Sequence, residues 1–356
     1  MCIFGSYPSS YMKRLIRRPL FWIALLLLGI LFVIPYYQRV FSPNVTTANG
    51  EPQDFYIATG SDYIAVGEQL LEQKLIQDPQ AFHWVAEQMN YPRHVYPGRY
   101  ILQDGMSTRE LVQLLRSGRQ EPVQFTFVKF RTPEQLAHYV GEQLEMNARD
   151  LLDLLNDREY LSKHGGLKPE TAITIFIPNT YELYWNITPK DFFERMYKEY
   201  RTFWNDSRNE KRQQWGLNRL EVMTLASIVE EETNKNDEKA RIAGVYLNRI
   251  RKGWPLEADP TVKFAVGDFT LRRVLYEHLQ VDSPYNTYLY PGLPPGPICT
   301  PSISSIDAVL NGERHDYMFF VARIDGSGYH HFSETLAQHN AYAREYRQML
   351  NERGIR

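Results

Sequence analysis

Apolar positions first gather into one continuous run near the N-terminus. Leu20–Ile34 is apolar apart from Gly29, and Pro19–Gln38 contains no charged residue. Twenty helical residues span about 30 Å at 1.5 Å per residue, which is the thickness of the hydrocarbon core of a bilayer. The run therefore predicts a single transmembrane helix over residues 19–38.

Charge on the two sides of this run predicts its orientation. Residues 1–18 carry four basic residues and no acid, and the formal charge of −2 for the whole chain leaves −6 for residues 39–356. Because basic flanks stay in the cytoplasm, we expect a cytoplasmic tail over residues 1–18 and an exported body. A cleaved signal peptide is the alternative, but Pro35–Arg39 offers no cleavage site between small residues, which favours an uncleaved anchor.

The exported part opens with a linker and a small unit. Residues 39–53 are polar and contain two prolines and a glycine, as linkers do. Residues 54–120 then alternate between strand and helix patterns. Strands are expected at 54–59 and 97–102, and helices from Asp62, Asp78 and Ser107 onward. Residues 54–120 are thus predicted to form a compact strand–helix–helix–strand–helix unit.

The remaining residues, 121–356, predict a larger, helix-rich domain. Alternation indicates strands at 123–127 and Thr171–Ile177, followed by a loop at Pro178–Tyr181. Asp325-Gly326 predicts a β-hairpin turn. Helices are expected from Thr132, over 189–204, 217–233 and 335–352, and from a cap at Asn236 to Gly253, with an ordered loop over 280–302. The fold class is mixed α+β.

Composition excludes several function classes. With 43% hydrophobic and 23% charged residues the chain is a folded globular type, and its charge of −2 argues against a dedicated nucleic-acid binder. Cys2 and Cys299 are expected on opposite sides of the membrane, so they cannot pair within one chain. The adjacent His330 and His331 would point to opposite faces of a strand, so neither a metal site nor a cofactor is expected.

An acidic triplet ends the helix expected over 217–233. On a helical wheel of about 100° per residue, Glu231 falls opposite the apolar arc and is expected to be solvated, whereas Glu230 and Glu232 fall at its two edges. Desolvation at a core boundary raises a carboxyl pKa, as a general acid requires. Periodicity does not choose between Glu230 and Glu232, and a solvated helix end is the plain alternative.

The residues around this triplet carry a resemblance. Ala226–Thr233 reads ASIVEEET and resembles the ASIIExET signature of the endolytic murein transglycosylases, the YceG-like (MltG) family. Further blocks match the family in order. They are Val245-Tyr246-Leu247-Asn248-Arg249, Leu256–Val262, Ser283–Tyr288, Gly292–Ile298 and Tyr317–Ala322, followed by His331-Phe332 and His339-Asn340.

The resemblance implies an architecture and an activity. It implies a LysM-like subdomain over residues 54–120 and a YceG-like catalytic domain over 121–356. Members of the family cut the β-1,4 bond between N-acetylmuramic acid and N-acetylglucosamine inside peptidoglycan strands, without water, and leave 1,6-anhydro ends. Such an enzyme terminates glycan polymerisation. The partners implied are peptidoglycan glycan strands, the bacterial inner membrane and glycan-polymerising penicillin-binding proteins.

The resemblance also implies roles for individual residues. Motif position places the catalytic acid on Glu230. The candidate substrate contacts are Glu232, Asn179, Tyr181, Asp259, Thr261, Tyr285, Asn286 and Thr287. Loop structure is the alternative reason for most of these residues. Two departures stand out, since Asn179 replaces the family's usual Asp and Glu257-Ala258 replaces its usual Gln or Arg.

Two other functions stay open on the sequence. A muramidase of the same architecture would hydrolyse with water and needs a second carboxylate opposite the acid, for which Asp259 is the candidate. A non-catalytic scaffold would only bind peptidoglycan.

Overall fold

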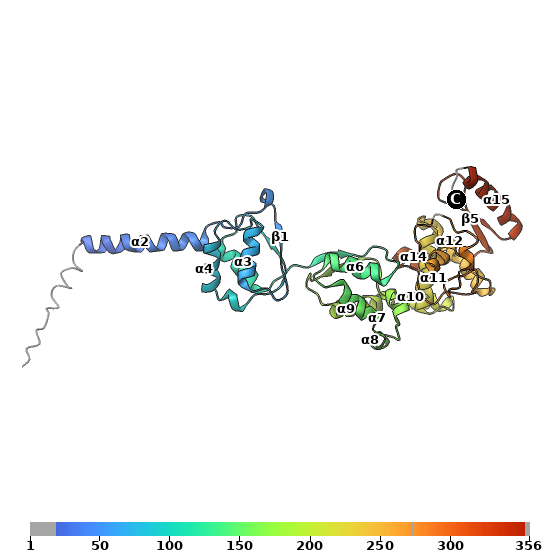
Figure 1. Ribbon diagram of the computed structural model, residues 1–356, viewed down its shortest axis with the longest axis horizontal. Helices are drawn as coiled ribbons and strands as arrows, with labels where there is room; N and C mark the ends of the chain where they lie inside the picture. The colour runs from blue at the N-terminus through green and yellow to red at the C-terminus, as the bar shows by residue number, and fades with distance from the viewer. Residues whose placement is uncertain (1–18, 272, 353–356) are drawn as a thin grey trace, which may run out of the picture. The chain divides into compact units, whose positions relative to one another are not determined.

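The structure is a computed structural model that describes residues 19–271 and 273–352 (Figure 1). Within these residues the chain forms two compact units. The first comprises residues up to 123 together with 184–186, and the second comprises 124–183 and the residues from 187 onward. The tail predicted at residues 1–18, with Cys2, lies outside the described residues. The predicted α+β class is confirmed, since helices predominate and the sheets described have two strands each.

The N-terminal apolar run is helical, as predicted. Helix α2 is Pro19–Phe41, and its segment Trp22–Phe41 is long and apolar enough to cross a membrane. The helix continues three residues beyond the expected end and so includes Arg39. Val40 is buried in the first unit. The Arg109 guanidinium lies over the Phe41 ring, with its Cζ 5.5 Å from the ring centroid.

One antiparallel ribbon and three helices build the rest of the first unit. Strand β1 is Gln53–Ile57 and pairs with β2, Gly98–Leu102, so that Phe55 lies opposite Tyr100. The helices are α3 (Tyr63–Glu72), α4 (Pro79–Gln88) and α5 (Thr108–Ser117), with 3-10 turns η1 (Ala48–Gly50) and η2 (Tyr91–Arg93) between elements. The helices begin at the caps expected from the sequence. Asp62, Asp78 and Ser107 each accept a hydrogen bond from a backbone N–H of the first turn.

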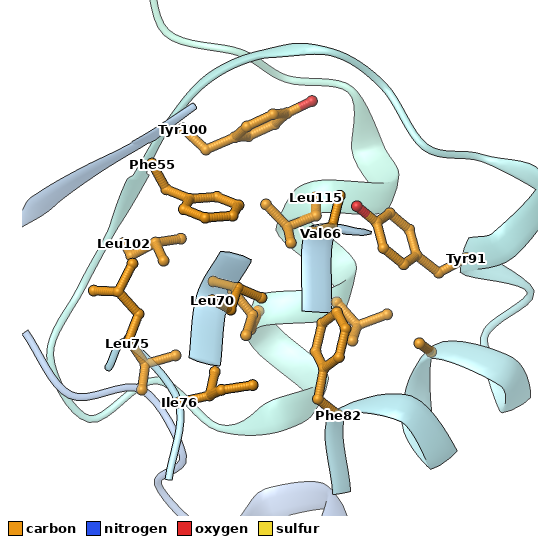
Figure 2. Close-up of a cluster of buried hydrophobic side chains, with 14 of the residues drawn as sticks. Phe55, Val66, Leu70, Leu75, Ile76, Phe82, Tyr91, Tyr100, Leu102 and Leu115 are labelled. Carbon is orange, nitrogen blue, oxygen red and sulfur yellow. The ribbon is translucent and has the colours of Figure 1, made fainter. Parts of the chain in front are cut away.

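Figure 2 shows the core of this unit. Phe55 comes from β1 and Tyr100 and Leu102 come from β2, and their side chains meet Leu70 of α3 and Leu115 of α5. All five side chains are fully buried. Alternation along the strands and helical spacing along the helices therefore direct one face of each element into a common core.

Strands β3 (Val123–Thr126) and β4 (Thr180–Leu183) form a second small sheet. Helices α6 (Pro133–Gln143), α7 (Ala148–Asn156), α8 (Arg158–Ser162), α9 (Pro189–Phe203) and α10 (Asp206–Gln214) accompany it. The strand predicted at Thr171–Ile177 is wrong, because Pro169–Ile175 is a 3-10 helix, η3. Its threonines are not solvent-facing: Thr171 and Thr174 are buried, and their hydroxyls donate to nearby backbone carbonyls. The loop predicted at Pro178–Tyr181 is confined to Pro178 and Asn179, because Thr180 and Tyr181 belong to β4.

The remaining elements position the site. Helices α11 (Arg219–Glu232), α12 (Asn236–Arg251), α13 (Asp259–Val266) and α14 (Ile303–Leu310) pack together, with the 3-10 turn η4 (His278–Gln280) beside α13. The predicted hairpin is confirmed as β5 (Phe319–Ala322) against β6 (His330–Ser333), and α15 (Leu336–Glu352) packs on it. Lys235 rather than Asn236 occupies the cap position of α12.

Candidate active site

Helix α11 brings three glutamates into three different environments. Asn218 caps its first turn in a reciprocal capping box with Glu221, and Thr233 ends the helix in an extended conformation. Between these ends, residues 222–229 are all buried. The helix therefore has no solvated face, and the wheel's division into apolar and solvated sides does not hold for its last turn.

Glu230 lies in a cationic, hydroxyl-rich cluster. Its Oε2 accepts hydrogen bonds from Ser302 Oγ and Ser305 Oγ at 2.5 Å each, and from Lys239 Nζ at 3.1 Å. Burial alone would raise the pKa of Glu230, but these three donors outweigh it and hold the pKa below its ordinary value. The raised pKa expected of a catalytic acid at Glu230 is therefore wrong. These donors favour the ionised form of the Glu230 carboxyl group.

Glu231 is paired rather than solvated, which corrects the sequence-based expectation. Its two carboxylate oxygens lie 2.7 Å from Lys129 Nζ and 2.9 Å from Arg131 Nη2. Burial opposes ionisation, yet the two cations lower the pKa of Glu231. Glu231 lies on the polar side of α11, and the loop before α14 covers that side. The backbone N–H of Ile298 in this loop donates a hydrogen bond to Ser227 Oγ.

Glu232 is the member of the triplet that reaches a cavity. Its Oε1 accepts a hydrogen bond of 2.5 Å from the Tyr246 hydroxyl. Burial raises the pKa of Glu232 to about 7, the Tyr246 hydrogen bond opposes this rise, and the negative charge of Asp259 adds to it. A carboxyl group with this pKa is substantially protonated near neutral pH and can donate that proton.

The cavity at Glu232 has a volume of about 450 Å³ and lies within the second unit. Its walls come from the end of α11, from α12 and α13, from the β5–β6 hairpin and from α15. The acidic wall residues are Glu232, Glu257 and Asp259, and the aromatic ones are Tyr246, Tyr288, Phe319, Phe320 and Tyr346. Aromatic rings with a few polar groups in a space of this size are typical of a ligand site.

Arg249 organises one wall of the cavity. Its guanidinium donates to the carbonyls of Leu256 and Met318 at 2.9 and 2.8 Å and to Glu257 Oε2 at 2.9 Å. The backbone of Glu257 has a φ of 50°, a left-handed conformation that residues other than glycine rarely adopt. Arg249 thereby fixes the segment that leads into α13.

Asp259 is the second predicted residue that reaches the cavity. It begins α13, and its Oδ1 accepts a hydrogen bond of 2.7 Å from the Tyr288 hydroxyl. Burial and the neighbouring carboxylates raise the pKa of Tyr288 well above its ordinary value, so this hydroxyl stays protonated. Asp259 and Glu232 therefore share one cavity, each with a tyrosine donor.

Three predicted substrate contacts serve the loop structure instead. Thr261, Asn286 and Thr287 are buried. The Thr261 hydroxyl donates to the Ala258 carbonyl at 2.7 Å, Thr287 Oγ1 accepts from the Ala258 N–H at 3.0 Å, and Asn286 donates to the carbonyls of Leu279 and Val281. Their polar groups are satisfied internally, so the prediction that they contact substrate is not supported.

The other three predicted contacts also lie outside this cavity. Tyr181 is buried, and its hydroxyl donates to the Ile177 carbonyl at 2.8 Å. Asn179 is exposed beside β4 and accepts a hydrogen bond from the Thr180 N–H. Tyr285 is half-buried and packs on Phe264 with ring centroids 4.7 Å apart.

The cavity contains residues to which the sequence analysis assigned no role. Tyr246, Tyr288, His339 and Asn340 occur in the blocks that match the family signature, so the blocks were the available signal. His330 lies next to such a block. What the sequence could not supply was the direction in which each side chain points.

Metal and thiol chemistry find no support in the part of the chain that the structure describes. Over residues 19–271 and 273–352, no group of three or more His, Cys, Asp or Glu side chains could hold a metal ion. Burial raises the pKa of Cys299 well above its ordinary value, which makes it a poor nucleophile.

Comparison with known proteins agrees with this architecture. The pattern of the YceG-like family matches residues 55–345, most of the chain. The chain belongs to the YceG-like family. It is 29% identical over 313 residues to an endolytic murein transglycosylase of Bacillus subtilis, a match that covers 83% of this chain and 85% of that protein.

Two further relatives support the family assignment. An endolytic murein transglycosylase of Streptococcus pneumoniae is 27% identical over 301 residues, and the match covers 75% of this chain and 54% of that protein, so this YceG-like chain matches about half of its length. A crystal structure of a YceG-like protein from Listeria monocytogenes superposes with a TM-score of 0.54 at 28% identity, covering 82% of this chain and 99% of that one.

Proposed function

We propose that this YceG-like protein is a membrane-anchored endolytic peptidoglycan transglycosylase with Glu232 as its catalytic acid. The observation that carries the proposal is the position of Glu232: a carboxyl group with a pKa raised to about 7 that lines an aromatic cavity of about 450 Å³. The curated relatives named endolytic murein transglycosylases supply the substrate class. The role moves from Glu230 to Glu232 because a general acid has to hold its proton near neutral pH.

The reaction needs one carboxyl group. Protonated Glu232 donates its proton to the bridging oxygen as the bond from C1 of the N-acetylmuramoyl residue to that oxygen breaks. The C6 hydroxyl of the same sugar then bonds to C1 and loses its proton, which closes a 1,6-anhydro ring. One proton is given and one is released, so no water is consumed.

Hydrolysis is the second candidate, and one observation favours it. Asp259 lies in the cavity that contains Glu232, and glycoside hydrolases use two carboxyl groups in this way. In that reaction Asp259 would activate water and the product would carry a reducing end. In this structure the hydrogen bond from Tyr288 occupies Oδ1 of Asp259.

The location and the other parts of the chain belong to the same proposal. Helix α2 supports a single-pass anchor in the inner membrane, with residues 1–18 in the cytoplasm and the rest exported. We assign residues 54–120 to a LysM-like glycan-binding subdomain and 121–356 to the catalytic domain. The linker expected over residues 39–53 packs onto that subdomain instead, since Val40 and Val45 are buried in its core. The strand–helix–helix–strand order of β1, α3, α4 and β2 supports the LysM-like assignment. An anchored enzyme of this kind would end nascent strands beside penicillin-binding proteins that polymerise glycan.

Analysis of the product ends tests the reaction. The full chain in detergent is incubated with purified peptidoglycan, and the new glycan ends are identified by mass. Anhydro ends are expected. Reducing ends would instead establish the muramidase, and binding without cleavage would establish a non-catalytic scaffold.

A further inference from the structure

A buried imidazole–carboxylate pair forms part of the cavity wall. His330 on β6 and Glu238 on α12 are both buried. Glu238 Oε2 lies 2.9 Å from His330 Nδ1, and Glu238 Oε1 accepts a hydrogen bond of 3.0 Å from the His330 backbone N–H. The carboxylate therefore holds both the ring and the backbone of the same residue.

This pairing determines which nitrogen of His330 is free. A carboxylate can only accept hydrogen bonds, so Nδ1 carries the proton and Nε2 of the neutral ring keeps its lone pair. Nε2 makes no hydrogen bond to any residue that the structure describes, and the side chain, which lines the cavity, keeps 10% of its surface exposed. We infer that Nε2 opens into the cavity as a hydrogen-bond acceptor.

The surroundings hold the ring rigidly in place. The Phe320 ring meets the His330 ring edge to face, with centroids 5.4 Å apart, and Phe320 meets Tyr246 in the same way at 5.7 Å. Tyr246 in turn donates to Glu232. A chain of direct contacts thus connects the imidazole to the carboxyl group that we propose as the acid.

Other ionisable groups face His330 from the elements packed around it. Besides Glu238 on α12, Arg323 donates to the His330 carbonyl at 3.2 Å. The remaining charged or titratable groups share the cavity. They are Glu232, Tyr246, Arg249, Glu257, Asp259, Tyr288, His339 and Tyr346. Glu238 is the group that bonds the imidazole directly.

We propose that His330 Nε2 is the base that removes the proton from the C6 hydroxyl of the sugar, and that Glu238 is its positioning residue. The proposal rests on the proposed function and divides the reaction between two groups. Glu232 protonates the departing oxygen as its bond to C1 breaks, and the C6 oxygen bonds to C1 as its proton moves to Nε2. Proton exchange with solvent then restores neutral His330 and protonated Glu232.

The sequence offers a matched pair of variants for the test. His331 is the next residue on β6, does not line the cavity and stacks on Tyr342 with centroids 4.3 Å apart. His330→Gln is therefore compared with His331→Gln in the full chain in detergent, on purified peptidoglycan, across pH. His331→Gln is expected to keep the wild-type rate and pH profile.

His330→Gln is expected to lower turnover by roughly 10²-fold or more, the usual contribution of general base catalysis. It should also remove the acid-side fall in rate, because no imidazole remains to be protonated, and leave the alkaline side unchanged. A merely structural role would lower the rate without removing one side of the profile. Wild-type rate and profile in this variant would overturn the inference.

Glu238→Gln provides a second test that needs His330 intact. The amide NH2 of glutamine can donate to Nδ1, which favours the tautomer in which Nε2 carries the proton and cannot accept another. Turnover should therefore fall toward that of His330→Gln while KM stays the same, and wild-type turnover in Glu238→Gln would overturn the inference even if His330→Gln failed to fold. Absence of anhydro ends with the wild-type protein would instead contradict the proposed function itself, which separates the two failures.

Discussion

Two glutamates two residues apart in α11 have pKa values that are shifted in opposite directions. Glu230 receives four hydrogen bonds, one of them from a lysine, whereas Glu232 receives one from a neutral tyrosine. The pKa of Glu230 is lowered and that of Glu232 is raised to about 7. Donor number and donor charge thus decide which of two similarly placed carboxyl groups can act as an acid.

The Tyr246 hydroxyl is expected to set the upper end of the pH range for activity. Its hydrogen bond stabilises the ionised form of Glu232, so Tyr246→Phe should raise the pKa of that carboxyl further above 7. The acid must be protonated, so the alkaline fall in rate should move up by roughly one pH unit, which corresponds to about 1.4 kcal/mol. Rate measurements across pH check this, and an unmoved or lowered alkaline side would contradict it.

Sequence reasoning identified the triplet and the family and placed the acid on Glu230, whereas our proposal places it on Glu232. The wheel assumed that α11 has a solvated side, whereas the loop before α14 covers that side through the Ser227 hydrogen bond to Ile298. The serines that donate hydrogen bonds to Glu230 follow it by more than 70 residues. No local pattern reports such long-range partners.

At the scale of elements, the Glu230 network joins three helices. Lys239 comes from α12, Ser305 from the first turn of α14 and Glu230 from the end of α11. The backbone of α12 also passes very close to the segment before β5 at Gly244, where a Cβ atom would lie 2.3 Å from the Glu313 carbonyl oxygen. These contacts hold the carboxyl end of α11, and so Glu232, in place.

Lys239→Met is expected to destabilise the fold by about 2–3 kcal/mol, because it leaves the half-buried Glu230 carboxylate without its cation. Chemical denaturation measures this loss. Arg241→Met is the matched control on the same helix: its ion pair with Glu313 is exposed and should be worth less than about 1 kcal/mol. Equal losses in the two variants would contradict the role assigned to the network.

The same network predicts how stability depends on pH. The folded pKa of Glu230 lies below its ordinary value of 4.5, so its contribution is present above about pH 4.5 and is lost as the pH falls through the folded pKa. Glu230→Gln should remove this part of the acid-induced loss of unfolding free energy. An unchanged acid dependence in that variant would contradict the assignment.

Elements with strong local signals could be predicted, and elements fixed by burial could not. The caps at Asp62, Asp78 and Ser107 and the Asp325-Gly326 turn each act within a few residues, and the structure has helices and a hairpin there. The alternation over residues 171–177 predicts a strand, but Pro169–Ile175 forms the 3-10 helix η3. The whole segment is buried, and its threonine hydroxyls donate to backbone carbonyls nearby in the chain. Alternation of apolar residues and threonines therefore does not indicate a strand here.

At the scale of the whole molecule, the anchor can be tested directly. The full chain should sediment with membranes and be released by detergent but not by high salt, because an apolar helix rather than charge would hold it. A chain that begins at Arg39 should be soluble. Release of the full chain by salt alone would contradict the anchor.

The central claim is that Glu232, and not Glu230, donates the proton. The decisive measurement compares the glycan ends released from purified peptidoglycan by Glu232→Gln and Glu230→Gln, with the fold of each variant checked by thermal unfolding. We predict that Glu232→Gln remains folded and releases no anhydro ends, while folded Glu230→Gln still releases them. Anhydro ends produced by Glu232→Gln at the wild-type rate would contradict the account.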